Sequence, residues 1–263
     1  MSIAAEIKGT CVPQNTIAVW SLGQAGCVFK SSQGTIVYVD PYLGDACNQL
    51  YGLERLLTPP VEAADVQADF VLATHNHADH LDPDAFPVIA RHNATALLIG
   101  PSSCTNAMRE LGIPASQTYT LNHDDVLHSG HVRIHATFAN HVWDDPDDAP
   151  DAVGYVIDFG GLRVYISGDT LYHERMEGIA SLQPNLAFIC INGRWGNMSA
   201  AEAAHLATVL RAQTAVPTHY NMFANNMADP ADFAGALKAE GGSVQPLVLS
   251  PGQCVLYPER DAS

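Results

Sequence analysis

Three histidines and an aspartate occupy six consecutive residues of the chain, in the order His75-Asn76-His77-Ala78-Asp79-His80. Imidazole and carboxylate groups are the usual protein ligands of catalytic metal ions. His75 and His77 alternate by two and can point the same way from an extended backbone, whereas Asp79 and His80 follow after the chain turns. The spacing therefore predicts a site at which two metal ions lie side by side.

The elements on either side of this cluster must position it. The apolar run from Phe70 to Ala73 predicts a short buried strand, and Asp82-Pro83 predicts the cap and first residue of a helix to about Arg91. The cluster thus lies on a strand-to-helix loop. With 12 histidines in the chain some pairs fall close together by chance, but packing alone would not select this order at a strand end.

Short strands alternate with helices along the rest of the chain. Strands are predicted at 17–22, 27–30, 35–39, 95–99, 132–138, 153–159, 162–167 and 186–191. Helices are predicted after Ser102 or Ser103, ending at Gly112, after the capping box Ser199-Ala200-Ala201-Glu202, and from Pro230.

The two halves of this pattern resemble each other. In each half two strands meet at a glycine turn, and the second strand leads to an aspartate, first Asp40 and later Asp169. A duplicated unit whose sheets pack face to face, with helices outside, would bring both aspartates to one edge. We predict an α/β fold and a single domain over residues 1–263, with Asp144–Asp148 as a solvated loop.

Composition narrows the function. The chain has 12 Lys and Arg against 28 Asp and Glu, a formal net charge of −16, which disfavours nucleic acid and anionic membranes and favours a small-molecule substrate. No basic leader or long apolar run occurs, and the six cysteines are scattered, so we expect a cytoplasmic protein with reduced thiols. The sequence leaves the oligomeric state open, and a homo-oligomer is allowed.

Two ions need more ligands than the loop supplies, and three later residues follow predicted strands. They are His141, Asp169 and His219. The alternatives are an exposed loop histidine at 141, with His135 as its competitor, a turn cap at Asp169, and a structural histidine at 219. The other histidines, His92, His123, His128, His131, His173 and His205, are expected at the surface.

The pattern His75-x-His77-x-Asp79-His80 with these three later residues resembles the metallo-β-lactamase superfamily. Ala18-Val19-Trp20-Ser21-Leu22-Gly23, Ser167-Gly168-Asp169-Thr170 and Pro217-Thr218-His219-Tyr220 are similar to the branch that contains the L-ascorbate-6-phosphate lactonases. The resemblance runs from about Ile17 to Phe233 and implies a four-layer αββα sandwich.

The resemblance also implies the roles of individual residues. His75, His77 and His141 would hold one ion and Asp79, His80 and His219 the other, with Asp169 bridging them. Asp40 would orient a ligand imidazole. Nitrogen and oxygen ligands without thiolate suit Zn and Mn, and Fe as well, so two divalent ions are expected.

These expectations lead to a metal-dependent hydrolase, in which Asp79 orients a metal-activated water toward a small lactone, phosphorylated or not. Substrate contacts are expected from Asn192, Arg194 and Trp195, with Arg194 as an anion clamp, and from Tyr220, Asn221 and Phe223 beside His219. The alternatives are a metallo-phosphodiesterase or other ester or amide hydrolase of the same fold, a mononuclear iron dioxygenase and a non-catalytic metal protein.

Overall fold

The computed structural model describes residues 2–142 and 151–258. In the first half of the chain the elements are α1 (Ile3–Gly9), β1 (Ile17–Gly23), β2 (Gly26–Ser31), β3 (Ile36–Val39), α2 (Ala46–Tyr51), the 3-10 helix η1 (Ala63–Asp65), β4 (Phe70–Leu72), α3 (Phe86–His92), β5 (Leu97–Gly100), α4 (Ser102–Glu110), η2 (Ala115–Gln117) and β6 (Thr118–Thr120).

The second half repeats the alternation. Its elements are β7 (Val126–Ser129), β8 (Val132–Phe138), β9 (Val153–Asp158), β10 (Arg163–Ile166), the 3-10 helix η3 (Glu174–Leu182), β11 (Leu186–Cys190), α5 (Ala200–Val209), β12 (Thr214–Thr218), α6 (Pro230–Ala239), β13 (Gln245–Pro246) and β14 (Cys254–Tyr257).

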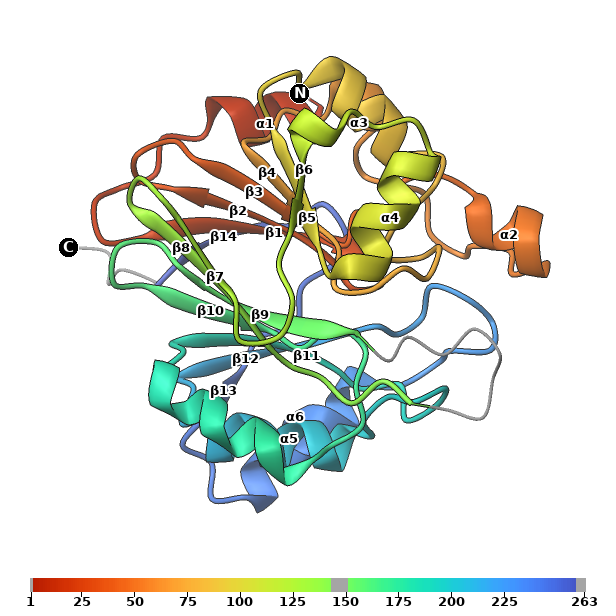
Figure 1. Ribbon diagram of the computed structural model, residues 1–263. Coiled ribbons are helices and arrows are strands. Elements are labelled where there is room, and N and C mark those ends of the chain that lie inside the picture. Colours follow the sequence, from red (N-terminus) through yellow and green to blue (C-terminus); the bar gives the residue numbers. More distant parts are fainter. Residues whose placement is uncertain (1, 143–150, 259–263) are drawn as a thin grey trace.

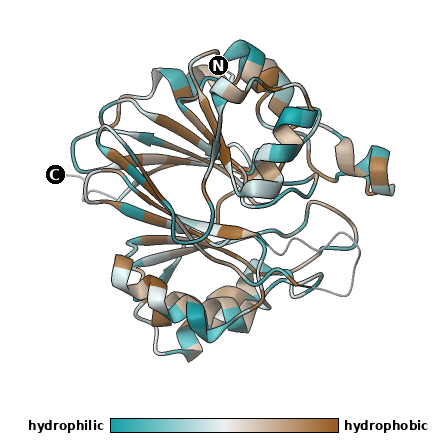
Figure 2. Cartoon of the chain, in the orientation of Figure 1, coloured by the Kyte–Doolittle hydropathy of each residue, from teal (hydrophilic) through white to brown (hydrophobic). Residues whose placement is uncertain are grey.

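The strands of the described residues form two facing seven-stranded sheets (Figure 1). One has the order β14-β1-β2-β3-β4-β5-β6 and the other β13-β12-β11-β10-β9-β8-β7. Helices α1, α3 and α4 cover the outside of the first sheet, and α5 and α6 cover the outside of the second (Figure 1). Hydrophobic residues concentrate on the strands, and the helices carry the hydrophilic ones outward (Figure 2). The predicted αββα sandwich is confirmed.

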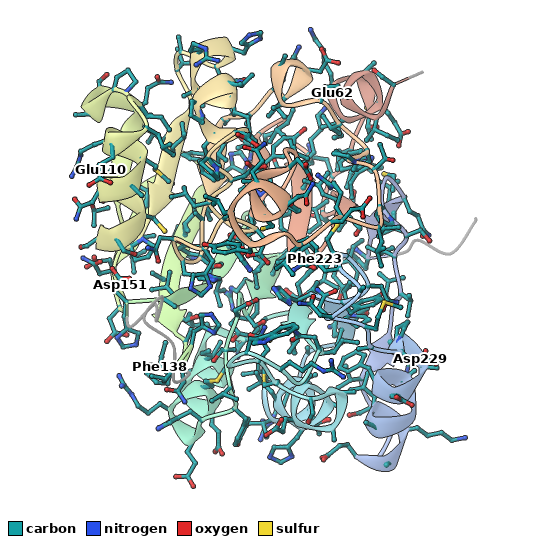
Figure 3. All side chains as sticks on the ribbon, turned by 90° about the vertical axis from the view of Figure 1, so that its right-hand side faces the viewer. Glu62, Glu110, Phe138, Asp151, Phe223 and Asp229 are labelled. Carbon is teal, nitrogen blue, oxygen red and sulfur yellow. The ribbon has the colours of Figure 1, made fainter. Side chains whose placement is uncertain are left out.

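The two halves have matching topology. Strands β1, β2 and β3 are antiparallel and β3 pairs in parallel with β4, just as β8, β9 and β10 are antiparallel and β10 pairs in parallel with β11. Asp40 directly follows β3. Asp169 follows β10 after Ser167 and Gly168. Both face one edge of the sandwich, which is turned toward the viewer in Figure 3 with Phe223 between the two halves.

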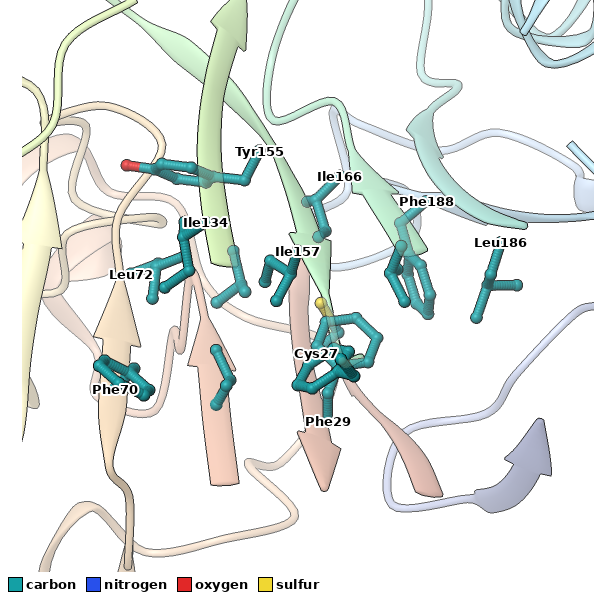
Figure 4. Packing of buried hydrophobic residues seen from close by; sticks show 14 of the residues in the cluster. Cys27, Phe29, Phe70, Leu72, Ile134, Tyr155, Ile157, Ile166, Leu186 and Phe188 are labelled. Carbon is teal, nitrogen blue, oxygen red and sulfur yellow. The ribbon is translucent and has the colours of Figure 1, made fainter. Parts of the chain in front are cut away.

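A continuous apolar core joins the inner faces of the sheets. Phe29 of β2 and Phe188 of β11 meet edge to face, with ring centroids 5.3 Å apart. Leu72, Ile134 and Ile157 fill the space beside them (Figure 4). Burying one such side chain contributes about 1.5–3 kcal/mol, so the sandwich has a stabilising core that is independent of any metal.

Helix boundaries differ from the prediction at two places. Helix α3 begins at Phe86 and not at Pro83, because the buried Asp82 carboxylate accepts the backbone N–H groups of Asp84 and Ala85 in a preceding turn. The same carboxylate accepts the N–H groups of Leu43 and Gly44, so it ties two loops together. Helix α4 has Pro101 at its N-cap, with no side-chain cap from Ser102 or Ser103.

The starts of α5 and α6 agree with the sequence, whereas α1 and α2 were not predicted. Ser199 and Glu202 form the predicted reciprocal capping box, and Asp229 accepts the N–H of Ala231 ahead of α6. The acidic stretch at 144–148 lies outside the described residues. Within the described ranges, no helix has the length and apolar character that crossing a membrane requires.

Candidate metal centre

The His-rich loop leaves β4 at the sheet edge and turns back on itself. The carbonyl of His77 accepts the N–H groups of His80 and Leu81, at 3.0 and 2.8 Å, and this turn returns the end of the loop toward its beginning. His75 and His80 are completely buried, whereas the Asp79 side chain is 17% exposed. A loop of this shape presents its four ligand-type side chains from two sides of one turn.

The structure brings the three later candidates to this loop. His141 comes from the segment after β8, Asp169 from the end of β10 and His219 from the end of β12. Ligand atoms gather within 4.8 Å in three sets, His75 with His77 and His141, His75 with His80 and Asp169, and Asp79 with His80 and His219. The sets overlap, so all seven residues form one cluster.

Distances within the cluster suit metal ligation. Bonds of 2.0–2.1 Å to a tetrahedral ion place two ligand nitrogens about 3.3 Å apart. Nδ1 of His77 and Nε2 of His141 are 3.3 Å apart, and Nε2 of His219 lies 3.2 Å from Asp79 Oδ2. Nε2 of His75 is buried without a hydrogen-bond partner among the described residues, as a nitrogen reserved for a metal would be. The donor set therefore fits two ions.

The cluster is electrostatically prepared for positive charge. Burial alone would raise the pKa of Asp79 and Asp169, but the neighbouring His80 and His219 outweigh it and lower both. Burial would lower the pKa of His219, but Asp169 and Asp79 raise it to about 9. The carboxylates thus remain ionised beside cationic imidazoles, and metal ions can replace the protons that these imidazoles carry.

The other end of the loop behaves differently. Burial and the neighbouring imidazoles of His80, His77 and His141 hold the pKa of His75 well below its usual range. Burial likewise lowers the pKa of His141. Neutral imidazoles carry the lone pair that a metal needs, so this end of the cluster is ready to bind without losing a proton.

Asp40 holds the loop in place. One of its carboxylate oxygens accepts the Thr74 N–H at 2.8 Å, and the other contacts both Thr74 Oγ1 and His80 Nδ1 at 2.8 Å. The contact with Nδ1 leaves Nε2 of His80 directed at the cluster. Gly168 packs on the same threonine so closely that an added Cβ would lie 2.7 Å from it.

The loop after β11 supports the cluster from the second sheet. The carbonyl of Gly196 lies 3.2 Å from His141 Nδ1, which leaves the other ring nitrogen facing His77. Asn197 donates its amide to Asp169 Oδ2 at 2.8 Å. In this loop the backbone and the asparagine thus position two members of the cluster.

A cavity of about 260 Å³ opens onto the cluster. Its lining consists of Gln24, Cys47, Tyr51, Leu53, His77, Asp79, His141, Asp169, Trp195, His219, Phe223, Asn225 and Asn226. Of the residues expected to contact substrate, Trp195 and Phe223 border this space. Arg194 is exposed and donates to the carbonyl of Asn225 at 3.2 Å.

The other expected substrate residues are not among those that line the cavity. Asn192 is buried and bridges to Ser199, Tyr220 packs against the core under α5, and Asn221 accepts the N–H of Ala228. The lining residues that the sequence did not indicate include Gln24 from the turn between β1 and β2, Cys47 and Tyr51 from α2, and Leu53 just after α2. Glutamine and apolar residues have no diagnostic spacing. The turn Gly23-Gln24-Ala25-Gly26 between two predicted strands was the only sequence feature that contained one of these lining residues.

Comparisons with known proteins agree with this geometry. A family model described as "Beta-lactamase superfamily domain" matches residues 35–220. A "UPF0173 metal-dependent hydrolase" from Archaeoglobus fulgidus is 30% identical over 239 residues, covering 88% of this chain and 95% of that protein.

Solved structures show the same fold at low identity. A metallo hydrolase from Ignicoccus hospitalis has a TM-score of 0.77 at 23% identity and covers 94% of this chain and 100% of its own. An isothiocyanate hydrolase from Delia radicum gut bacteria has a TM-score of 0.73 at 19% identity, covering 90% and 98%. With the matched family model and the clustered ligands, these findings show that the chain belongs to the metallo-β-lactamase superfamily, among its metal-dependent hydrolases.

Proposed function

We propose that the chain is a two-metal hydrolase of small, uncharged lactones or esters. His75, His77 and His141 would hold one ion, and Asp79, His80 and His219 the other, with Asp169 between them. The three overlapping ligand sets support this division, because Asp169 falls in the set that joins His75 of the first group to His80 of the second. Zn, Mn and Fe all accept such nitrogen and oxygen ligands.

Ions bound there supply water activation near neutral pH and polarisation of a substrate carbonyl. The protein's own part is to hold the reacting groups in place. Asp79 borders the cavity and remains partly exposed, so its carboxylate can accept a hydrogen bond from a water molecule in that space. Trp195 and Phe223 also line the cavity and reduce the room in it for other water molecules.

The observation that carries the substrate class is the lining of the cavity. Among the described residues, the only lining side chains that carry formal charge belong to the metal cluster, and the rest are amides, a thiol, a phenol, an indole and apolar groups. Arg55, which is partly buried, donates its guanidinium N–H groups to the carbonyls of Leu57 and Gly44. Outside the metal cluster a phosphate group would meet no cationic side chain of this lining, so we favour a substrate without one.

This proposal also rejects nucleic acid as a substrate. A nuclease must offset closely spaced phosphates along a basic track, and the chain has a formal net charge of −16. A small cavity with an aromatic wall suits a compact molecule with one apolar substituent.

The test is turnover of a panel of lactones, aryl esters, phosphodiesters and single-stranded RNA, with metal content measured on the same sample. We expect two ions per chain and the highest kcat/KM on an uncharged lactone or ester. His77→Ala should abolish this turnover, and His92→Ala, an exposed histidine on α3, should leave it unchanged. A fully active sample with one ion would contradict the two-metal site, and faster cleavage of RNA than of any ester would overturn the substrate class.

A further inference from the structure

A chain of three amide contacts connects the backbone to the metal cluster. The N–H of Phe223 donates to Asn226 Oδ1 at 2.8 Å, and Asn226 Nδ2 donates to Gln24 Oε1 at 2.8 Å. Gln24 Nε2 then donates to Asp79 Oδ2 at 2.7 Å and lies 3.0 Å from His219 Nε2. Gln24 and Asn226 are both almost fully buried.

The direction of this chain is fixed by its first link. A backbone N–H can only donate, so Asn226 must turn its oxygen toward Phe223 and its NH₂ group toward Gln24. Gln24 must in turn present its oxygen to Asn226 and its NH₂ group to the cluster. The site therefore receives a hydrogen-bond donor from Gln24 and never an acceptor.

The backbone of Gln24 also contacts the cluster, at His219. Its carbonyl accepts the N–H of His219 at 2.8 Å. Both residues adopt a left-handed conformation, with φ of 51° at Gln24 and 59° at His219. Non-glycine residues seldom adopt this conformation, and where they do the surrounding contacts must hold them there.

We propose that Gln24 is a positioning residue for the Asp79 and His219 half of the cluster and sets the affinity of the ion held there. The inference rests on the two-metal site proposed above. Asp79 is the more exposed of the two carboxylates in the cluster, so it has the greater freedom to turn toward the cavity. The amide N–H restrains that carboxylate, and the carbonyl restrains the histidine that shares its ion.

The experiment is a Co²⁺ titration of the metal-free full chain, followed by visible absorption and by calorimetry. Gln24→Met keeps the length of the side chain and removes both amide groups. We expect one of the two binding steps, the one that fills the site of Asp79, His80 and His219, to lose about 10–100-fold in affinity, the usual effect of removing a group that orients a ligand. The other step should keep its affinity and its absorption spectrum.

Two further variants make the test specific. Asn226→Ala breaks the chain one step away and should weaken the same step, so it serves if Gln24→Met does not fold. Asn225→Ala changes a neighbouring amide that lines the same cavity outside this chain of contacts, and both steps should keep their affinities. Thermal unfolding midpoints of the three variants report any general loss of structure.

Equal losses in both steps would overturn the proposal, because they would indicate a structural role. Unchanged affinities in both Gln24→Met and Asn226→Ala would also overturn it, while leaving the two-metal site intact. A wild-type chain that binds one Co²⁺ would overturn the two-metal site itself and with it this role for Gln24.

Discussion

At the scale of single residues, the cluster depends on close backbone approaches as much as on its ligands. Gly196 adopts φ of 75°, and a Cβ added there would lie 2.9 Å from His141 Nδ1. Gly196→Ala should therefore displace the imidazole and lower the affinity for the ion at His75, His77 and His141 by about 10-fold or more. A competition titration of Zn²⁺ against a chromophoric chelator measures this loss.

The matched control is Gly235→Ala in α6, where an added Cβ meets no atom within 4 Å. This variant should leave metal affinity unchanged and raise the free energy of unfolding by about 0.5–1 kcal/mol, because alanine favours the helix. If Gly196→Ala binds Zn²⁺ as tightly as the wild type, the close approach of Gly196 to His141 does not set the affinity of this site.

What the sequence predicts at this scale depends on residue type. Few side chains ligate metals, so the spacing of His75, His77 and His80 is informative on its own. An amide such as Gln24 can lie almost anywhere, and its place beside Asp79 follows from the packing of a turn against a distant loop. Arg194 was expected to face the substrate for its charge alone, but in the structure it reaches along the surface to Asn225.

At the scale of elements, the nine strands that the sequence predicted lie within one or two residues of their observed bounds, because period and glycine turns define them. Strands β6, β7, β13 and β14 at or near the sheet edges were not predicted. Strand β8 matches its predicted bounds, Val132–Phe138. Helix α3 was placed too early because Asp82-Pro83 has the local pattern of a helix start. The Asp82 carboxylate instead accepts the N–H of Leu43, which lies 39 residues away in the sequence. A local pattern cannot predict such a contact.

Strand pairing in the second sheet offers a test of stability against pH. Asp158 of β9 accepts the Gly161 N–H and contacts the guanidinium groups of Arg133 on β8 and Arg163 on β10, both cross-strand partners. Burial would raise the pKa of Asp158, but these three contacts outweigh it and lower the pKa. Because the folded-state value is below the unfolded one, the carboxylate stabilises the fold above about pH 4 and ceases to do so as the pH falls further.

Asp158→Asn should therefore lower the free energy of unfolding by about 1–2 kcal/mol at pH 7, since both guanidinium groups are partly exposed. The difference from the wild type should shrink below about pH 4, because the unfolded chain there takes up a proton that the folded carboxylate does not bind until the pH is lower. Urea unfolding at pH 7, 5 and 3.5 measures it, with Asp124→Asn, a mostly exposed carboxylate, as the control. A difference that stays constant over this range would show that charge is not the cause.

At the scale of the whole molecule, the metal cluster draws on both halves of the sandwich. The His-rich loop belongs to the first sheet, and His141, Asp169 and His219 follow strands of the second. The duplicated order of strands made this edge predictable, because both copies end their third strand there. Bound ions would therefore link the two sheets, which the apolar core between them already joins.

Removing metal should accordingly weaken the fold without abolishing it. At free ion concentrations 1,000 times the dissociation constant, one bound ion stabilises the folded state by about 4 kcal/mol. For a domain of this size that corresponds to a fall of about 10 °C in the unfolding midpoint when a chelator removes it. Calorimetry and far-ultraviolet circular dichroism with and without chelator measure the midpoint and the secondary structure, and added Zn²⁺ should restore the midpoint.

His77→Ala provides the comparison, because it loses a ligand before any chelator is added and its midpoint should fall less on chelation. The apolar contacts between Phe29 and Phe188 persist without metal, so the dichroism spectrum should keep its shape. A chelated wild-type chain that loses its secondary structure at 25 °C would show that the ions, and not the core between the sheets, hold the two halves together.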